Sequence, residues 1–362
     1  TRLPILNGLK AFRQFLNQQR AALGASPVLL VEGDLDLSND KKRNSPPQSS
    51  ELFKHVQLLC TSVGLRTATS HPSSSYFPFV NDIPSQLELA QRIGAVSIIG
   101  IGSSSGVELA KALGQQGDFE HLVLVPATPS ATLLASASHS LLMDPSEPAL
   151  MAHPTLMAPR QLETQHLVLP EASVLPKEDL PTVLATVYSA LVLAIDELCR
   201  GNDNNEETAI QTIQKCLGII QKLNDSQSEA VANVEASSLQ EITTWAGSTL
   251  QFGFTGEKRS IPLALAISLV PTEFSDDTLF GFMSYLLPGM LKVLEGTQHR
   301  NIALEISKTC LDICPRLSQK SGDELTSVGM LSHVHANQFL WGCMDEDDSI
   351  LEVVLDESLK QK

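Results

Sequence analysis

The sequence predicts an α/β domain with a parallel, Rossmann-like sheet, followed by an all-α domain. Short apolar runs alternate with helical patterns in the first half of the chain, whereas only helical patterns follow residue 170. The chain has 362 residues, of which 43% are hydrophobic, and this content suits two cores better than one. We therefore expect a nucleotide-binding-like α/β domain at 1–170 and a helical domain at 171–362.

The first half contains four apolar runs that are typical of buried strands. These runs are 27–31, 65–69, 96–101 and 121–125. Helical patterns lie between them at about 50–64, at 83–93 and in a segment that runs through Leu113. The polar stretch Asn39 to Ser50 is expected to be a loop. This alternation favours a parallel sheet with helices on both faces.

The second half consists of segments with helical spacing. They are 181–200, 206–224, 230–252, 261–268, 278–296, 302–313 and 322–344. The polar stretch Gly201 to Asn205 separates the first two and is expected to be a loop. No apolar run approaches the length of a membrane-spanning helix, and no signal-peptide pattern opens the chain. We expect no transmembrane segment.

Charge and cysteine content restrict the classes of partner and compartment. The net charge of −16 and the pI near 4.9 disfavour binding to nucleic acid. The six cysteines lack zinc-finger spacing, which favours a reducing, intracellular compartment, either the cytoplasm or the interior of an organelle. The chain begins at Thr1, which is compatible with removal of a targeting segment. A protein partner or a homo-oligomer remains open.

A glycine and serine turn is the main candidate for a ligand site. The segment 102–111 reads GSSSGVELAK, follows an apolar strand and opens a helix. Backbone N–H groups and the positive end of a helix can hold a phosphate in such a turn. The alternative is an ordinary strand-to-helix turn with serine N-caps, and the sequence alone leaves both readings open.

This turn resembles the Gly-Gly-Gly-Ser-x-x-Asp-x-x-Lys pattern of the iron-containing alcohol dehydrogenases. Gly102, Ser105 and Lys111 stand at matching places, while serines replace two glycines and a glutamate replaces the aspartate. Downstream, the stretch 125–132 resembles the family turn that lines the cofactor site, and Pro126 and Thr128 match best. The cofactor-binding residues that the resemblance implies are Gly102, Ser103, Ser104, Ser105, Glu108 and Thr128.

The resemblance implies a dehydroquinate synthase-like fold and leaves NAD(P) open as a cofactor. Glu32 or Asp34, after the first apolar run, could face an adenosine ribose, and solvated turn residues are the alternative. Leu133 and Leu134 stand where the family has serine and glutamate, so this part of the pocket is expected to be apolar.

The residues at the family's metal positions are not metal ligands. The family uses one aspartate and three histidines, and the segment 186–196 resembles its stretch that carries the first two. In this register Ser189 replaces the aspartate and Leu193 replaces a histidine, while Pro262 and Leu279 fall at the third and fourth positions. Leucine and proline side chains offer no lone pair to a divalent cation. We therefore expect no metal.

Other clusters of metal-binding residue types are interpreted as structural. Cys310 and Cys314 could share one helix face, although small apolar side chains at that spacing are more typical of a core. His139, His153 and His166 fall in a middle segment that we expect to be rich in loops, with solvated or hydrogen-bonded roles. None of the usual hydrolase, phosphate-loop or zinc-protease motifs is present in the sequence.

Two functions follow from these observations. The first is a degenerate iron-containing alcohol dehydrogenase-like pseudoenzyme without metal-dependent hydride transfer, which acts as a binding or structural and assembly protein. The second is an NAD(P)-dependent alcohol or aldehyde oxidoreductase that works without the metal, with Tyr188 or Lys111 as the proton donor. For Tyr188, packing in the core is the alternative role.

Overall fold

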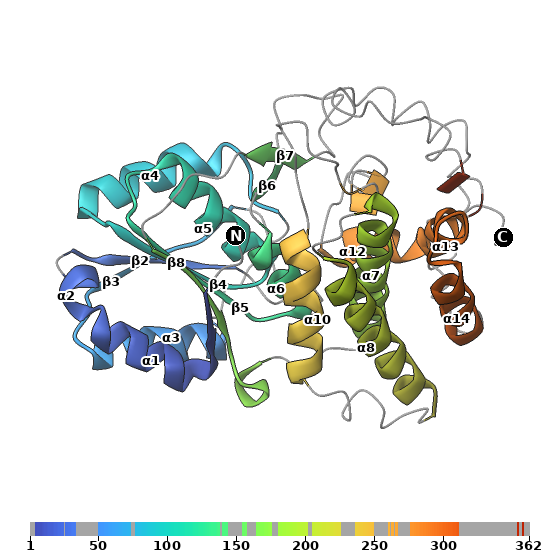
Figure 1. The fold of residues 1–362 in the computed structure, drawn as a ribbon. Coiled ribbons are helices and arrows are strands. Elements are labelled where there is room, and N and C mark those ends of the chain that lie inside the picture. Colours follow the sequence, from blue (N-terminus) through green and yellow to red (C-terminus); the bar gives the residue numbers. More distant parts are fainter. Residues whose placement is uncertain are drawn as a thin grey trace, which may run out of the picture. The chain divides into compact units, whose positions relative to one another are not determined.

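The chain forms two compact units, 1–177 and 178–362 (Figure 1). The structure is a computed structural model. It describes residues 4–24, 26–33, 50–73, 77–137, 140–143, 154–157, 164–175, 180–201, 205–225, 236–249, 260, 262–263, 265–266, 276–310, 353–354 and 357.

The first unit is built on a six-stranded parallel sheet. Its order is β1 (Ile5–Asn7), β8 (Thr164–Leu169), β5 (His121–Pro126), β4 (Ser97–Gly102), β2 (Val28–Glu32) and β3 (Thr67–Ser70). A separate antiparallel pair joins β6 (Ser140–Met143) to β7 (Pro154–Met157). Because all six strands are parallel, their carboxyl ends lie at one end of the sheet, and the turns that follow them lie there too.

Helices cover both faces of this sheet. One face carries α1 (Gly8–Gln18), α2 (Arg20–Leu23) and α3 (Glu51–Ser62), and the other carries α4 (Asp82–Ile93), α5 (Ser104–Gln116) and α6 (Pro129–Ser136). Figure 1 shows α1 to α3 on the opposite side of the sheet from α4 and α5. Successive strand residues alternate between the two cores: Leu30 packs with Phe12 and Val56, whereas Leu29 packs with the apolar face of α5. The doubly covered sheet explains why β2, β4 and β5 are continuous apolar runs.

Local signals fix several helix ends. The Ser50 hydroxyl accepts a hydrogen bond of 3.1 Å from the Phe53 N–H and caps the start of α3. Helix α4 ends at Gly94, which adopts the left-handed conformation with φ at 66°. Gly100 in β4 allows α5 to lie close, because a Cβ there would stand 2.5 Å from the Ala110 Cβ.

The second unit is helical in its described residues. Its helices are α7 (Leu180–Arg200), α8 (Glu206–Asp225), α10 (Ala236–Thr249), α12 (Asp276–Tyr285), α13 (Leu287–Glu295) and α14 (Arg300–Cys310). Helix α7 packs against α8, α10, α12 and α13, and every residue from Thr186 to Leu198 is buried. A helix that is apolar around most of its circumference belongs inside a bundle.

Helix α7 corrects one expectation. Its segment Thr182–Arg200 has a mean hydropathy of 1.6 and, by length and composition, could cross a membrane. The prediction that no apolar run approaches that length is therefore wrong. However, 78% of its most apolar stretch is buried inside the fold, which is what a core helix of a bundle shows. This burial is consistent with a chain that has no membrane span among its described helices.

The predicted fold class is confirmed, with differences in the middle of the chain. The four predicted strands and the helices between them correspond to β2, β3, β4 and β5 with α3, α4 and α5. The expected loop-rich segment instead contains β6, β7 and β8, and β8 lies between β1 and β5 in the sheet. The single helix expected at 278–296 is two helices, α12 and α13. The predictions for 39–49 and for 322–344 lie outside the described residues.

Candidate functional site

The turn after β4 is shaped by a close approach of two backbone segments. Gly33, just after β2, donates its N–H to the Ile101 carbonyl at 2.8 Å. A Cβ on Gly106 would stand 2.3 Å from the Gly33 nitrogen, and one on Gly33 would stand 2.5 Å from the Gly106 nitrogen. Gly102 has a φ of 103°, a conformation that favours glycine. These three glycines therefore hold the ends of β2 and β4 against the start of α5.

The three serines of this turn are buried. The exposed fractions of Ser103, Ser104 and Ser105 are 4%, 0% and 1%. The hydroxyls of Ser103 and Ser105 form a hydrogen bond of 2.9 Å with each other. Ser103 stands at the N-cap of α5, but its side chain makes no capping hydrogen bond. The reading of ordinary serine N-caps is therefore not what the geometry shows, because two of the hydroxyls are paired with each other.

Glu108 and Lys111 form a buried ion pair on α5. The Lys111 Nζ lies 2.9 Å from the Glu108 Oε1 and donates a second hydrogen bond of 2.8 Å to the Leu134 carbonyl of α6. The other Glu108 oxygen accepts the N–H of Leu141 in β6. Burial lowers the pKa of Lys111, and the neighbouring Glu108 carboxylate opposes this shift. The pair links α5 to α6 and β6.

The second candidate turn is organised by Thr128. Its hydroxyl accepts a hydrogen bond of 3.1 Å from the Ala131 N–H and caps α6, and it lies 3.0 Å from the Ser130 hydroxyl. Leu133 and Leu134 are buried in α6, as the sequence predicts for an apolar stretch. Thr128, which is proposed from the sequence as a cofactor-binding residue, thus has a defined structural contact.

Glu32, at the end of β2, contacts two other segments. Its Oε1 accepts a hydrogen bond of 2.8 Å from the Ser50 N–H at the start of α3. Its Oε2 lies 3.8 Å from the His71 Nδ1, and only 5% of Glu32 is exposed. The other candidate for a ribose contact, Asp34, lies outside the described residues.

Two of the residues predicted at the metal positions lie on one helix of the helical unit. Ser189 and Leu193 lie one turn apart on α7 and are both fully buried. The Ser189 hydroxyl donates a hydrogen bond of 2.8 Å to the carbonyl of Phe280 in α12, which adjoins Leu279 in the chain. Pro262 is also buried, whereas the side chain of Leu279 lies outside the described part. Ser189 on α7 and the backbone of Phe280 on α12 are therefore neighbours in space.

This arrangement does not fit a divalent metal. The Ser189 hydroxyl uses its proton in a hydrogen bond to a carbonyl, and the Leu193 side chain fills the adjacent turn with hydrocarbon. Within the described residues, no group of three or more His, Cys, Asp or Glu side chains is placed to hold a metal ion. Metals of this class require carboxylate, imidazole or thiolate ligands.

Tyr188 lies directly before Ser189 and is fully buried in α7. The same helix carries a charged cluster that was not singled out from the sequence. Arg200 lies 3.0 Å from Asp196 and 2.7 Å from Glu197, and Asn205 donates a hydrogen bond of 2.7 Å to Glu197. The spacing of three and four residues was a visible signal for this cluster. Its burial depends on the neighbouring helices and could not be read from the spacing.

Comparisons with known proteins show similarity at the level of structure. No family model and no curated protein matches the chain. A maleylacetate reductase from Agrobacterium tumefaciens is 14% identical with a TM-score of 0.66, and the match covers 99% of this chain and 96% of that one. An iron-containing alcohol dehydrogenase from Thermotoga maritima is 14% identical with a TM-score of 0.63, covering 99% and 98%. The chain has the fold of the iron-containing alcohol dehydrogenases.

A third structure with this fold contains a dinucleotide. The sulfoacetaldehyde reductase from Bifidobacterium kashiwanohense, solved in complex with NAD+, is 12% identical with a TM-score of 0.69, and the match covers 99% of this chain and 98% of that one. The match spans both units, so the iron-containing alcohol dehydrogenase fold extends through the α/β sheet and the helical bundle. The resemblance predicted from the turn motifs and from α7 is thereby confirmed at the level of fold.

Proposed function

We propose that this chain keeps the iron-containing alcohol dehydrogenase fold without metal-dependent hydride transfer, and that it acts as a binding or structural protein. The observation that carries the proposal is the hydrogen bond from Ser189 to the Phe280 carbonyl. This bond joins the two segments, on α7 and α12, to which the resemblance assigns the first and the fourth metal position. A hydrogen bond between two neutral groups holds these helices together without a cation.

The chemistry of the family explains which catalytic step would be lost without the metal ligands. A bound metal polarises the alcohol oxygen and lowers its pKa, so that the hydride can leave from the adjacent carbon. Ser189 donates its proton to a carbonyl, and Leu193 and Pro262 present only hydrocarbon. Replacement of several ligands at once removes the electrophile, whereas a single replacement could be compensated by a neighbour or a water. The residues therefore support a role in binding or assembly.

A metal-independent oxidoreductase is the second candidate. The observation that favours it is the strand, turn and helix at Gly102, whose positive φ suits a turn that approaches a phosphate closely. The cofactor-binding residues proposed from the sequence are Gly102, Ser103, Ser104, Ser105, Glu108 and Thr128. Two observations weigh against the metal-independent oxidoreductase. Lys111 is held in a buried ion pair, and Tyr188 is enclosed in the helical core. Neither Lys111 nor Tyr188 is therefore readily accessible as a proton donor.

A thermal-shift titration tests the first proposal. The purified protein, treated with a chelator and then dialysed, is titrated with Zn²⁺ and with Fe²⁺ under anaerobic conditions. A ligand that binds the folded state raises Tm, by an amount that corresponds to about 2.7 kcal/mol at a concentration one hundred times its Kd. We expect no rise in Tm, whereas a metal-dependent alcohol dehydrogenase assayed in parallel should show one. Stoichiometric metal binding with a rise in Tm would overturn the proposal.

The same assay with NAD and NADP separates the two candidates. No shift with either dinucleotide supports a binding or structural role away from the cofactor turn. A shift with dinucleotide alone, together with turnover of an aldehyde in the presence of chelator, favours the metal-independent oxidoreductase. In that case the Tyr188→Phe variant should lose turnover and keep the shift if Tyr188 donates the proton.

A further inference from the structure

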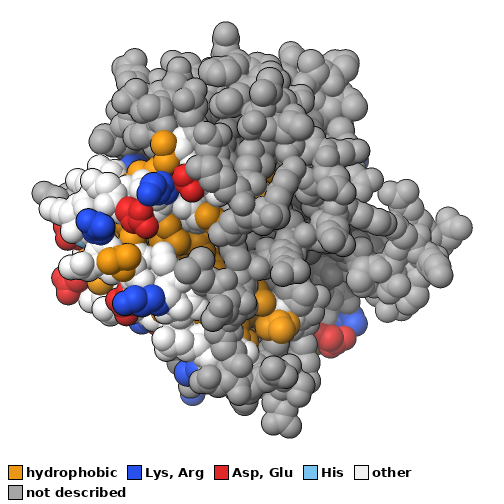
Figure 2. All heavy atoms as spheres, turned by 90° about the vertical axis from the view of Figure 1, so that its right-hand side faces the viewer, with side chains coloured by type: hydrophobic (Ala, Val, Ile, Leu, Met, Phe, Trp, Pro, Cys, Tyr) orange, Lys and Arg blue, Asp and Glu red, His pale blue; other side chains and the backbone are white. Residues whose placement is uncertain are grey.

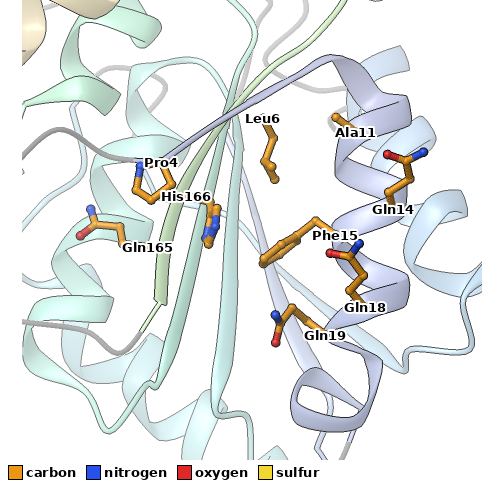
Figure 3. Close-up of a pocket in the computed structure, with 9 residues that line it drawn as sticks. All are labelled: Pro4, Leu6, Ala11, Gln14, Phe15, Gln18, Gln19, Gln165 and His166. Carbon is orange, nitrogen blue, oxygen red and sulfur yellow. The ribbon is translucent and has the colours of Figure 1, made fainter.

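A pocket of about 550 Å³ opens in the first unit, between α1 and the starts of β1 and β8 (Figure 3). Pro4 precedes β1 and Gln165 is near the beginning of β8, so the pocket lies toward the amino ends of the parallel strands. The Gly102 turn follows the carboxyl end of β4, at the opposite end of the sheet. The pocket is therefore separate from the candidate cofactor turn, and its volume is in the range of small-molecule sites.

The residues that line this pocket are uncharged. Four carboxamides contribute to it, from Gln14, Gln18, Gln19 and Gln165, together with the imidazole of His166. Apolar side chains, among them Phe15, complete the lining. The rings of Phe15 and His166 contact each other between α1 and the strands, with centroids 4.4 Å apart and planes tilted by 44° (Figure 3). Gln14 and Gln165 lie at the two sides of the pocket in this view.

The polar groups of the pocket have unused hydrogen-bonding capacity. Among the described residues, the His166 Nδ1 is buried and has no hydrogen-bond partner. Burial also lowers the pKa of His166, so the ring is neutral near pH 7. A carboxamide both donates and accepts, and a neutral imidazole has one donor and one acceptor nitrogen. The lining therefore offers both hydrogen-bond donors and hydrogen-bond acceptors. It offers no charged side chain that could pair with a charged ligand.

We propose that this pocket binds a neutral polyhydroxylated molecule, a sugar of one or two rings. Sugar hydroxyls also donate and accept at one atom, which matches carboxamides better than it matches charged side chains. The C–H face of a sugar ring is apolar and can lie on the aliphatic lining, which includes Leu6 and Ala11. An anion would find no cation in the lining, and the net charge of −16 would repel it. The proposal uses no residue from the metal positions, so it stands or falls independently of the proposed function.

Saturation-transfer NMR tests the proposal, with maltose and N-acetylglucosamine as the neutral probes and glucose 6-phosphate and glucosamine as charged comparisons. The Gln14→Ala/Gln18→Ala variant removes two carboxamides from the exposed surface of α1, where alanine is a good helix former. Gln91→Ala on α4 is the matched control, because Gln91 is also exposed on a helix and does not line the pocket. Circular dichroism and Tm establish that both variants keep the fold.

We expect transfer to at least one neutral sugar, and binding about tenfold weaker or more in the Gln14→Ala/Gln18→Ala variant, since two hydrogen bonds are lost. Gln91→Ala should bind like the unmodified protein. Binding should also be the same in low and high salt, because neither the neutral sugar nor the lining of the pocket is charged. The proposal is overturned if no neutral sugar binds at tens of millimolar, if a charged comparison binds more tightly, or if both variants weaken binding equally.

Discussion

At the scale of single residues, the most consequential contact is the ion pair of Glu108 and Lys111. Both side chains are almost completely buried, and each also bonds the backbone of another element. An ion pair in such a place costs desolvation energy for both charges, and its partners offset this cost only as a set. The pair therefore connects α5 to α6 and β6. The two charged side chains depend on each other, because each compensates the buried charge of the other.

Removal of one partner should be far more damaging than removal of both. We expect Lys111→Met to lower the free energy of unfolding by about 3–5 kcal/mol, because Glu108 is left buried and uncompensated. Glu108→Gln/Lys111→Met should recover much of this loss, since the glutamine carbonyl can still accept the Leu141 N–H. Urea denaturation measures both variants.

The exposed pair of Lys54 and Glu51 provides a matched control with the same spacing of three residues. Lys54→Met should leave stability unchanged, because water solvates the remaining carboxylate. Equal stability of the single and double variants of the buried pair would show that the two side chains are not energetically coupled.

His166 should give a measurable pH dependence of stability. Its folded pKa lies below the unfolded value of about 6.5 because burial disfavours the charged ring. The unfolded chain therefore binds the proton first as the pH falls. The contribution of the neutral ring is complete above the unfolded pKa and is lost as the pH falls through the lowered folded pKa.

Unfolding curves between pH 7.5 and pH 5 check this expectation. The slope of stability against pH should be smaller in His166→Gln than in the unmodified protein, and it should be unchanged in His55→Gln, which alters an exposed histidine. An identical slope in all three proteins would mean that the burial of His166 does not shift its titration.

At the scale of elements, the joint between β2, β4 and α5 depends on glycine. Two helical glycines allow a direct comparison of packing with helix propensity. Gly106→Ala should destabilise the protein by about 1–3 kcal/mol, because the new Cβ would meet the Gly33 nitrogen. Gly218→Ala in α8 should instead stabilise it by about 0.5–1 kcal/mol, because no atom lies within 4 Å of the added Cβ.

Thermal and urea unfolding measure the two glycine variants in parallel. A stabilising Gly106→Ala would show that β2 and α5 can move apart at little cost. Both variants should keep the native content of secondary structure, because glycine contributes no side-chain contact to the core at either position.

The elements differ in how well the sequence predicts them. Strands β2, β4 and β5 are buried on both faces, so they are long apolar runs and were found. Strand β8 contains Gln165 and His166 at its start, and β1 has only three residues, so both lacked this signal. The break between α12 and α13 was missed because Leu286 and Leu287 continue the apolar pattern, while Pro288 fits the first turn of a new helix.

The sequence proposes the residues of the candidate site, but it does not give their contacts. The prediction that Ser189 and Leu193 stand at metal positions rests on the resemblance of the segment 186–196 to the family pattern. Whether Ser189 bonds Phe280, or Gly33 meets Gly106, depends on elements far apart in the sequence. Likewise, the spacing of Glu108 and Lys111 shows that they can pair on a helix, whereas only the packing of α6 and β6 makes the pair buried.

At the scale of the whole molecule, net charge is the main global property. The chain carries −16 at neutral pH, and on the face shown in Figure 2 the described acidic and basic side chains are interspersed. Local pairing of this kind leaves the overall repulsion uncompensated, because the total is set by the excess of 41 acidic over 25 basic residues. Such repulsion opposes the compact state.

Salt should therefore stabilise the protein. We expect Tm to rise when NaCl is increased from about 0.05 M to about 0.5 M, since screening shortens the range of repulsion between exposed charges. Sodium chloride is preferred to sulfate, which also strengthens apolar burial. A fall in Tm over this range would mean that favourable ion pairs outweigh the net repulsion.

The close approach of Gly33 and Gly106 also allows two kinds of selection on this turn to be distinguished. Selection for folding alone retains glycine at 33 and 106, because any side chain there collides with backbone. Selection for a bound dinucleotide would constrain the serines and Glu108 as well. A library of variants scored only for abundance in cells should thus lose substitutions at the two glycines first. Any additional constraint on the serines in a functional screen would then report the ligand rather than the fold.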